Sequence, residues 1–340
     1  MALRKGSGRK ESGKGAIGRS TGLIGAPVKD HTVTKGMTVR DIVSQMGDAG
    51  GFSSRDIAAA VDILGEMVAE KGCLKFLSFP ACIIATGTRG VIRDMVKGRL
   101  FDVIITTCGT LDHDLARIWK DYHSGHFLMD DAVLHKEGVN RLGNVLVPNE
   151  SYGIVLEARL QPIFKDIYGS GKRCLSTREL IREVGLRLGD HVDDKARLES
   201  SIVWWAAKND IPIYVPGITD GAFGCQVWMF RQEHKDFMVD VFRDEDELAA
   251  KVFGLKRSGA LIIGGGISKH HTIWWNQFKD GLDYAVYLST ALEYDGSLSG
   301  ARVREAISWG KVKEDALTVN IDGEATAILP ILYAALLDGL

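Results

Sequence analysis

The sequence predicts a single large α/β domain with a Rossmann-like, mostly parallel sheet that carries helices on both faces. Two observations support this prediction. Short apolar runs alternate with segments of helical periodicity, and right-handed crossovers between such strands produce a parallel sheet. Residues suited to binding and catalysis directly follow several of these runs, at the edge where parallel sheets bind their ligands.

The composition is that of an ordinary globular protein. The chain has 340 residues, of which 45% are hydrophobic and 25% are charged. The net charge of −2 gives no overall field to attract nucleic acid or an anionic membrane, so we expect neither as a partner. No apolar run reaches membrane-spanning length. Five dispersed cysteines without CxxC spacing predict reduced thiols and a cytoplasmic protein.

The first 28 residues differ from the rest of the chain. They are rich in glycine, serine, lysine and arginine, with Glu11 as the acidic residue, and they contain no apolar signal core. We interpret them as a mobile basic arm, and contact with RNA or an acidic partner stays open as an alternative. Residues 29–340 form the predicted catalytic domain, whose folded part begins near Met37.

The first element expected in the domain is a helix that follows Ser53 or Ser54, either of which can cap it. Four apolar residues then fall on one face of this helix. They are Ile57, Val61, Leu64 and Val68.

The remaining elements continue the alternation of strands and helices. Strands are expected at residues 74–79, 103–107, 212–216, 226–230, 260–263, 283–288 and 317–321. Helices are expected at residues 88–97, 177–188, 197–208, 245–255, 270–280, 302–309 and 325–337. Residues 121–172 show the least regular pattern, which predicts loops or subunit contacts.

Glycine and hydroxyl residues follow four of the predicted strands, at residues 106–110, 219–221, 264–266 and 289–291. Glycines at 264–266, between an apolar strand and a helix, let the backbone approach a ligand closely. Taken alone, this turn is as typical of a tight connection as of a phosphate cradle. Together with the other three segments it favours a nucleotide cofactor.

Two further residue groups invite a chemical interpretation. Lys311 follows Trp309 and Gly310, where a lysine is more often a surface residue than a nucleophile. His270 and His271 are adjacent, so on a helix they point apart, and a third ligand at suitable spacing is missing. We therefore expect no metal site.

Several motifs together resemble the deoxyhypusine synthase family. They are Gly264-Gly265-Gly266 with Lys269-His270-His271, Glu293-Tyr294-Asp295-Gly296-Ser297, and Ser308-Trp309-Gly310-Lys311, supported upstream by Asn140-Arg141-Leu142-Gly143-Asn144 and Trp205-Ala206-Ala207-Lys208-Asn209. The resemblance extends from about residue 30 to the C-terminus.

The resemblance implies NAD as the cofactor. The residues that it places around NAD come from the segments that follow the predicted strands. These are Thr107, Cys108, Gly109, Asp220, Gly264, Gly265, Thr290, Ala291, Asp295, Glu324 and Ala325. Glu324 is a mild departure, because better-known members carry aspartate at that place.

The resemblance also implies catalytic and substrate-binding roles. Lys311 would carry an aminobutyl group as a covalent imine, and His270 would act as an acid or base beside the transferring amine. An amine is nucleophilic only when neutral, and an apolar neighbourhood favours that form. Glu305 would bind a substrate amine, and the Trp309 ring would hold a cation. Tyr287, Gly296 and Ser297 complete this implied substrate site.

The implied reaction is the transfer of an aminobutyl group from spermidine to a lysine of the translation factor 5A precursor, forming deoxyhypusine. NAD would take up and return a hydride, so the reaction has no net redox change. The family further implies a homotetramer with active sites between subunits.

The polyamine half of the site departs from the family pattern. His113, Cys225 and Leu298 stand where eukaryotic members place acids, and Trp274-Trp275 replaces a stretch that contains asparagine. Polyamine cations need carboxylate partners, which Asp112, Asp114 and Glu293 could supply instead.

Four interpretations remain open. The chemistry is unchanged, or the donor is an agmatine-like amine, or the acceptor is a free diamine as in a homospermidine-type synthase, or the chain is a non-catalytic NAD-binding paralogue.

Overall fold

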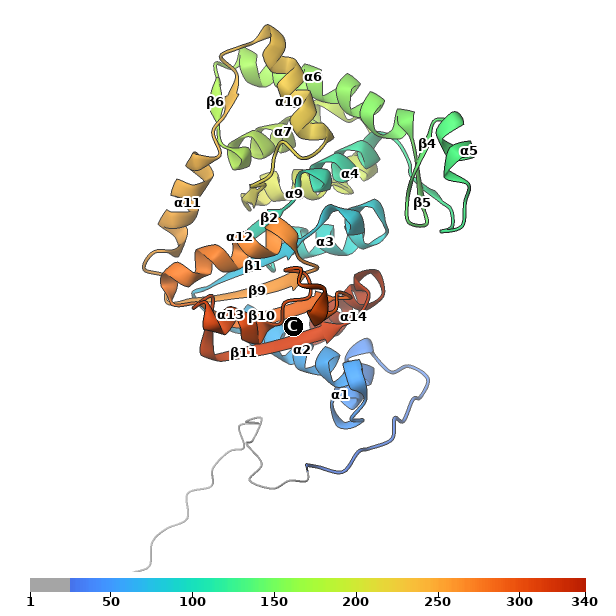
Figure 1. Ribbon diagram of the computed structural model, residues 1–340, viewed down its shortest axis with the longest axis vertical. Helices are drawn as coiled ribbons and strands as arrows, with labels where there is room; N and C mark the ends of the chain where they lie inside the picture. The colour runs from blue at the N-terminus through green and yellow to red at the C-terminus, as the bar shows by residue number, and fades with distance from the viewer. Residues whose placement is uncertain (1–24) are drawn as a thin grey trace, which may run out of the picture.

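The computed structural model describes residues 25–340 and shows an α/β fold built on one six-stranded parallel sheet (Figure 1). The strand order is β11-β10-β9-β1-β2-β7, and every neighbouring pair is parallel, which confirms the predicted fold class. The bounds are β1 Cys73–Phe79, β2 Val103–Thr106, β7 Ile213–Tyr214, β9 Arg257–Ile263, β10 Leu282–Ser289 and β11 Val312–Asp322. The predicted arm over residues 1–28 lies almost wholly outside the described residues.

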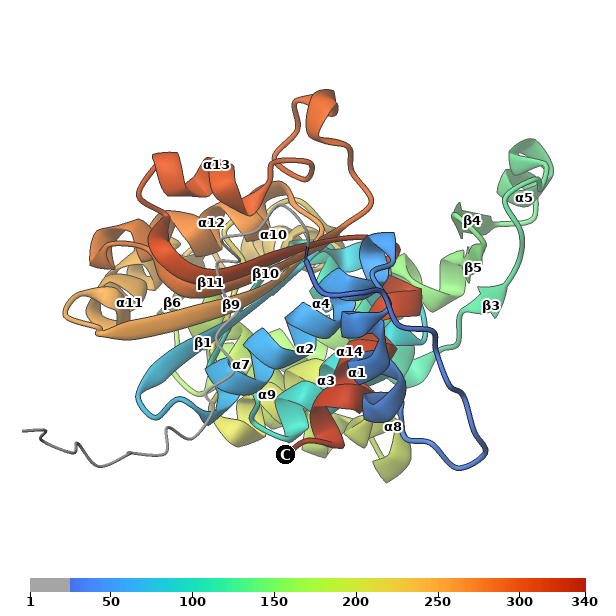
Figure 2. The same cartoon turned by 90° about the horizontal axis from the view of Figure 1, so that it is seen from below.

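Helices cover both faces of this sheet (Figure 2). Successive side chains of a strand alternate between the faces, so Phe76 belongs to one apolar core and Leu77 to the other. One face packs against α11 (Phe242–Val252), α12 (Gly266–Asn276) and α13 (Val303–Ser308). On the opposite face lie α2 (Phe52–Ala69), α3 (Thr88–Lys97) and α14 (Ala325–Leu337), and α1 (Val39–Asp48) packs on α2 and α14.

Helix α2 forms as predicted, but its start differs. The N-cap is Gly51, and neither Ser53 nor Ser54 caps the helix. The Ser53 hydroxyl instead donates a hydrogen bond to the Asp322 carbonyl, 3.0 Å away, which ties α2 to the end of β11. The predicted apolar face is correct, since Ile57, Val61 and Leu64 are buried.

A second group of helices packs beside the sheet. Its members are α4 (Cys108–Trp119), α6 (Gly153–Gly169), α7 (Thr177–His191), α8 (Lys195–Glu199), α9 (Ile202–Asn209) and α10 (Ala222–Glu233). The strand predicted at 226–230 is wrong, because these residues lie within α10. Phe223, Val227 and Phe230 are buried with helical spacing, and Phe164 of α6 packs edge-on against Phe223 at 5.7 Å between ring centroids.

The prediction of loops at 121–172 is wrong in part. Three short strands, β3 (His123–Ser124), β4 (Val139–Leu142) and β5 (Val145–Pro148), form a small antiparallel sheet, and α5 (Asp131–Lys136) packs on it. This unit projects from the body of the protein (Figures 1 and 2). The segment then continues into α6, which is fully regular. Two further short strands, β6 (Cys174–Leu175) and β8 (Met238–Val239), pair with each other.

Among residues 25–340, no helix combines the length and the apolarity that crossing a membrane requires.

Candidate active site

A cavity of about 290 Å³ lies between α12, α13 and the end of β10. It brings together six of the residues that the sequence assigned to catalysis or substrate binding. They are Lys311, His270, Glu305, Trp309, Tyr287 and Leu298. The other lining residues are Lys269, Ile273, Trp274, Ala301, Arg302 and Ala306.

Lys311 lies where α13 turns into β11. Gly310, with φ of +66°, lets the chain reverse there, and the Lys311 carbonyl accepts a hydrogen bond from the Leu282 amide at 3.1 Å. The lysine side chain is only 7% exposed. Its Nζ lies 5.3 Å from the Trp309 ring centroid and 5.7 Å from that of Trp274. Within residues 25–340, no hydrogen bond or ion pair engages this amine, so it is available to a ligand.

A second lysine, Lys269, lies in the same cavity and is bonded quite differently. Its Nζ donates to the carbonyls of Leu298 and Ala301, at 2.8 and 2.7 Å, and lies 4.3 Å from the Tyr287 ring centroid. Burial lowers the pKa of Lys269 to about 8. Because this amine is held by two carbonyls, Lys311 is the better candidate for a bond to substrate.

His270 lies close to the free amine of Lys311. Its ring stacks on Trp274, one helical turn further along α12, with 5.7 Å between ring centroids. Burial and the charge of Lys311 both lower the pKa of His270, so a neutral imidazole that can accept a proton is favoured near neutral pH. His271 points elsewhere, with its Nε2 3.3 Å from Glu245 of α11, and burial lowers its pKa to about 4.

Glu305 is the one carboxylate among the described residues that line the cavity. Leu298, at a position where an acid was expected, also lines it. The hydroxyl of Tyr287 is buried and has no hydrogen-bond partner among residues 25–340, and burial raises its pKa. A buried hydroxyl without a partner is costly, so a ligand that bonds to it would relieve that cost.

His113 and Cys225 are not among the residues that line the cavity. The Nδ1 atom of His113, on α4, lies 2.9 Å from the Tyr122 hydroxyl, and its ring also contacts that of Tyr152. Cys225 is exposed on α10. Neither residue therefore contributes to the cavity lining of its own chain.

The acids expected as substitutes do not reach the cavity either. Asp112 and Asp114 are fully buried on α4, where their carboxylates accept from the first amides of α10 and α9, respectively. Glu293 pairs with Arg304. None of these three acids lines the cavity in its own chain.

We predict that His113 makes the fold sensitive to mild acid. Burial lowers its pKa from 6.5 to about 4, so the unfolded chain takes up a proton more readily than the folded one. The free energy of unfolding that depends on neutral His113 is therefore at its full value above pH 6.5 and decreases as the pH falls towards 4. The loss is on the order of 2–3 kcal/mol. Urea denaturation at pH 7.5, 5.5 and 4.5 should show this loss. The His113→Gln variant should show a smaller decrease in the free energy of unfolding over the same pH range.

The residues assigned to a cofactor gather at the carboxyl ends of the strands. Thr107 follows β2, Gly264 and Gly265 follow β9, Thr290 and Ala291 follow β10, and Glu324 and Ala325 follow β11. Asp220 lies in the loop after β7, and Asp295 in the loop after β10. This clustering is the geometry by which doubly wound sheets bind nucleotides.

Residues 107–110 form the start of a helix. Cys108 begins α4, with Thr107 as its N-cap, and the Thr107 hydroxyl accepts a hydrogen bond from the Ala81 amide at 3.2 Å. Cys108 is fully buried, and burial raises its pKa to about 12, which removes it as a nucleophile. A Cβ on Gly109 would lie 2.9 Å from that of Ala81, so the start of α4 packs directly on the turn after β1.

The glycine turn requires glycine for two different reasons. Gly264 and Gly266 have φ of +67° and +68°, which L side chains rarely adopt. At Gly265 the reason is contact, because an added Cβ would lie 2.3 Å from the Cα of Ser299. The segment after β10 thus lies against this turn.

The carboxyl edge of the sheet has some of the features that a flat ligand requires. Exposed Asp220, Thr290 and Asp295 present polar groups, whereas Gly265 is buried against Ser299. Glu324 departs from this pattern, because its carboxylate accepts from the amides of Thr326 and Ala327 and so caps α14.

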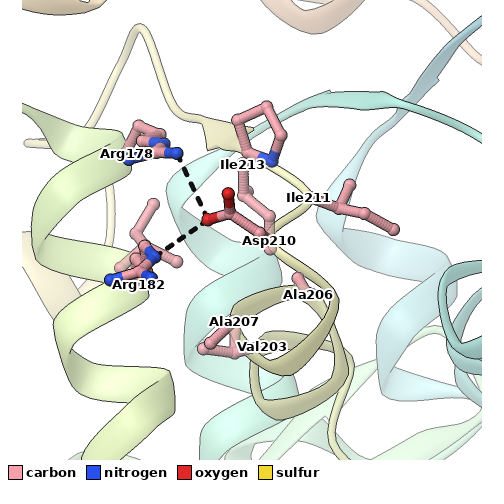
Figure 3. A pocket seen from close by; sticks show the side chains of 10 residues that line it. Arg178, Arg182, Val203, Ala206, Ala207, Asp210, Ile211 and Ile213 are labelled. Atoms are coloured by element: carbon pink, nitrogen blue, oxygen red, sulfur yellow. Dashed lines mark hydrogen bonds and ion pairs between the residues drawn. The ribbon is translucent and has the colours of Figure 1, made fainter.

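A different hollow, between α7 and α9, is not a ligand site (Figure 3). It has a volume of about 10 Å³, enough for a single water molecule. Asp210 faces it and pairs with Arg182 at 3.0 Å and Arg178 at 3.5 Å.

Sequence reasoning assigned no role to Lys269, Ile273 or Arg302, although all three line the cavity. Ile273 follows Lys269 by four residues and Trp274 follows His270 by four. That spacing places each pair on the same face of a helix and could have identified these neighbours.

The chain is similar to a group of known proteins along most of its length. The family described as deoxyhypusine synthase matches residues 41–336. A Thermoplasma acidophilum protein named as a probable deoxyhypusine synthase is 51% identical over 315 residues, which cover 93% of this chain and 98% of that protein. A relative of the same name from Ignicoccus hospitalis is 48% identical, over 93% of this chain and 97% of its own.

A crystal structure from Entamoeba histolytica that carries the same family name has a TM-score of 0.63. The match covers 91% of this chain and 96% of that one at 20% identity, so the likeness shows the fold alone.

Proposed function

Because the chain belongs to the deoxyhypusine synthase family and is therefore a transferase, we propose that it moves the aminobutyl group of spermidine to a lysine of the translation factor 5A precursor. The observation that carries this proposal is Lys311, an unbonded amine between two indole rings, with His270 and Glu305 in the same cavity. We place the reaction in the cytoplasm.

Each cavity residue has a role that its surroundings support. Glu305 pairs with an ammonium group of the donor. Once the donor has lost a hydride from the carbon beside its secondary amine, that carbon is an imine carbon to which the Lys311 amine can add. The bond from this carbon to 1,3-diaminopropane then breaks, and the imine remains on Lys311. His270 takes up the proton that the amine releases. The acceptor lysine then displaces Lys311.

NAD is proposed at the carboxyl edge of the sheet, held by Thr107, Asp220, Gly264, Thr290 and Ala291. When bound, it would accept a hydride from the donor and later return it. Since His113 and Cys225 lie away from the cavity of their own chain, we propose that the protein is a homotetramer in which neighbouring chains complete each site.

Mass spectrometry of the acceptor tests the proposal. Purified factor 5A precursor incubated with the protein, NAD and spermidine should gain the mass of one aminobutyl group on a single lysine. Omitting NAD should abolish the gain. Modification of a free diamine alone would instead support the homospermidine-type reaction, and the absence of any product with every amine would support a non-catalytic paralogue.

A second candidate, an agmatine-like donor, is favoured by one observation. Leu298 lines the cavity, where Glu305 is the one carboxylate, so a donor with fewer cationic groups than spermidine needs fewer counter-charges there.

We predict that Leu298→Asp strengthens spermidine use selectively. The new carboxylate faces a cavity that a polyamine would enter, and a charge-assisted contact contributes roughly 1.5–3 kcal/mol, which corresponds to about tenfold or more in kcat/KM. The value for agmatine should change little. Kinetics with both donors measure the effect.

Cys225→Asp is the matched control, because Cys225 is exposed on α10 and does not line the cavity. A selective gain for spermidine in this variant would show that a neighbouring chain contributes α10 to the site. If Leu298→Asp weakens both donors equally, the idea of a missing counter-charge is wrong.

A further inference from the structure

Lys269 is a buried charged group that the proposed reaction does not use. It is 2% exposed, and among residues 25–340 its Nζ is bonded to the carbonyls of Leu298 and Ala301 rather than to a carboxylate. Two charged groups act on Lys269 from a greater distance than these carbonyls. They are Glu305 of α13 and Arg302 of the segment before it. An ammonium group held by carbonyls alone is costly to bury, so an apolar residue would be preferred if packing were its only role.

The two carbonyls that hold Lys269 belong to one wall of the cavity. Leu298 and Ala301 lie in the segment that joins β10 to α13, while Lys269 belongs to α12 on the other side. The segment carries three lining residues, Leu298, Ala301 and Arg302. It leads directly into α13, which bears Glu305 and is followed by Trp309.

The first part of this segment is exposed. Leu292 and Tyr294 are 69% and 95% exposed, and the segment stands away from the body in Figure 2. Its last residues contact the body at two points, because Ser299 lies against Gly265 and Arg302 pairs with Asp322 of β11. The bonds from Lys269 are therefore the polar link that joins the wall to α12.

We propose that Lys269 is a positioning residue that sets the width of the donor cavity by tying residues 298–302 to α12. Lys311 performs the chemistry, and Lys269 holds the opposite wall at the distance that the donor requires. This inference rests on the proposed function for its kinetic consequence, while its structural consequence can be measured without turnover.

The test compares Lys269→Met and Lys269→Gln with the wild type in the full-length protein. Methionine keeps the length of the side chain and removes both hydrogen bonds, and glutamine keeps a donor for one carbonyl. The KM for spermidine should rise by about tenfold or more in the methionine variant and less in the glutamine variant, with a smaller change in kcat. Amide hydrogen exchange of residues 298–302 should accelerate in the same order.

Lys279→Met is the matched control. Lys279 is also buried but does not line the cavity, and its Nζ donates to the Gly281 carbonyl and to Asp283. This variant should lose stability but keep the wild-type KM and the wild-type exchange of residues 298–302.

Unchanged exchange in Lys269→Met, or equal effects on KM from Lys269→Met and Lys279→Met, would overturn the positioning role. A wild type that does not use spermidine would contradict only the proposed function, since the exchange measurement still decides the role of Lys269.

Discussion

Lys311→Arg is expected to lower kcat/KM for aminobutyl transfer on the order of 10³-fold or more. Losses of this size are typical when a covalent nucleophile is removed from an enzyme. Arginine keeps the positive charge and can still stack on Trp309, but its guanidinium stays protonated and cannot form the imine. Binding of the donor should therefore suffer far less than turnover. Single-turnover kinetics with spermidine and NAD separate the two effects.

Lys313→Arg is the matched control for this substitution. Lys313 lies two residues further on, and its Nζ pairs with Asp283 at 2.7 Å, a contact that arginine can also make. Its activity should stay close to that of the wild type.

Borohydride should trap an adduct on Lys311 in the wild type only when NAD and donor are both present. Transfer that persists in Lys311→Arg would exclude the covalent mechanism.

The central part of the fold was predictable because its signals are local. Strands β1, β2, β9 and β10 are buried on both faces, so each appears in the sequence as a short apolar run. Helix α3 matches its predicted bounds, 88–97, because Gly87 and Gly98 flank an amphipathic stretch. These patterns need no knowledge of what packs against them.

The errors occur where tertiary packing overrides composition. Residues 226–230 include Val227, Trp228 and Phe230, which favour a strand by composition, but the spacing of the buried side chains is helical. Helix α6 was missed because Pro162 lies within it and typically ends a helix. The helix predicted at 197–208 is broken at Ser201, whose side chain caps α9.

The site was predictable only in part, and the reason is the same. Family motifs identified Lys311, His270 and Glu305, which one cavity brings together. No motif could show that Lys269 is held by carbonyls about thirty residues away in sequence, or that the Glu324 carboxylate is used to cap its own helix. Such assignments depend on contacts between elements that only the folded chain brings together.

The largest loss of stability is expected from Asp114→Ala. The Asp114 carboxylate is fully buried and pairs with the Arg89 guanidinium at 2.7 Å. It also accepts hydrogen bonds from the Ser201 hydroxyl and from the Ile202 and Val203 amides, which begin α9. The alanine variant leaves Arg89 buried without a counter-charge and leaves the first turn of α9 without its acceptor. The expected loss in the free energy of unfolding is about 3–5 kcal/mol.

An exposed ion pair of equal length provides the control. Lys29 and Asp48 also approach to 2.7 Å, but their side chains are 70% and 61% exposed. Water screens that pair and replaces the lost partner, so Asp48→Ala should cost at most about 1 kcal/mol. Urea denaturation of both variants at one protein concentration measures the difference, because any association of subunits then contributes equally. Equal, small losses of unfolding free energy in both variants would contradict this prediction. They would show that burial does not increase the contribution of the Asp114–Arg89 pair to stability, and that α9 keeps its position through apolar packing alone.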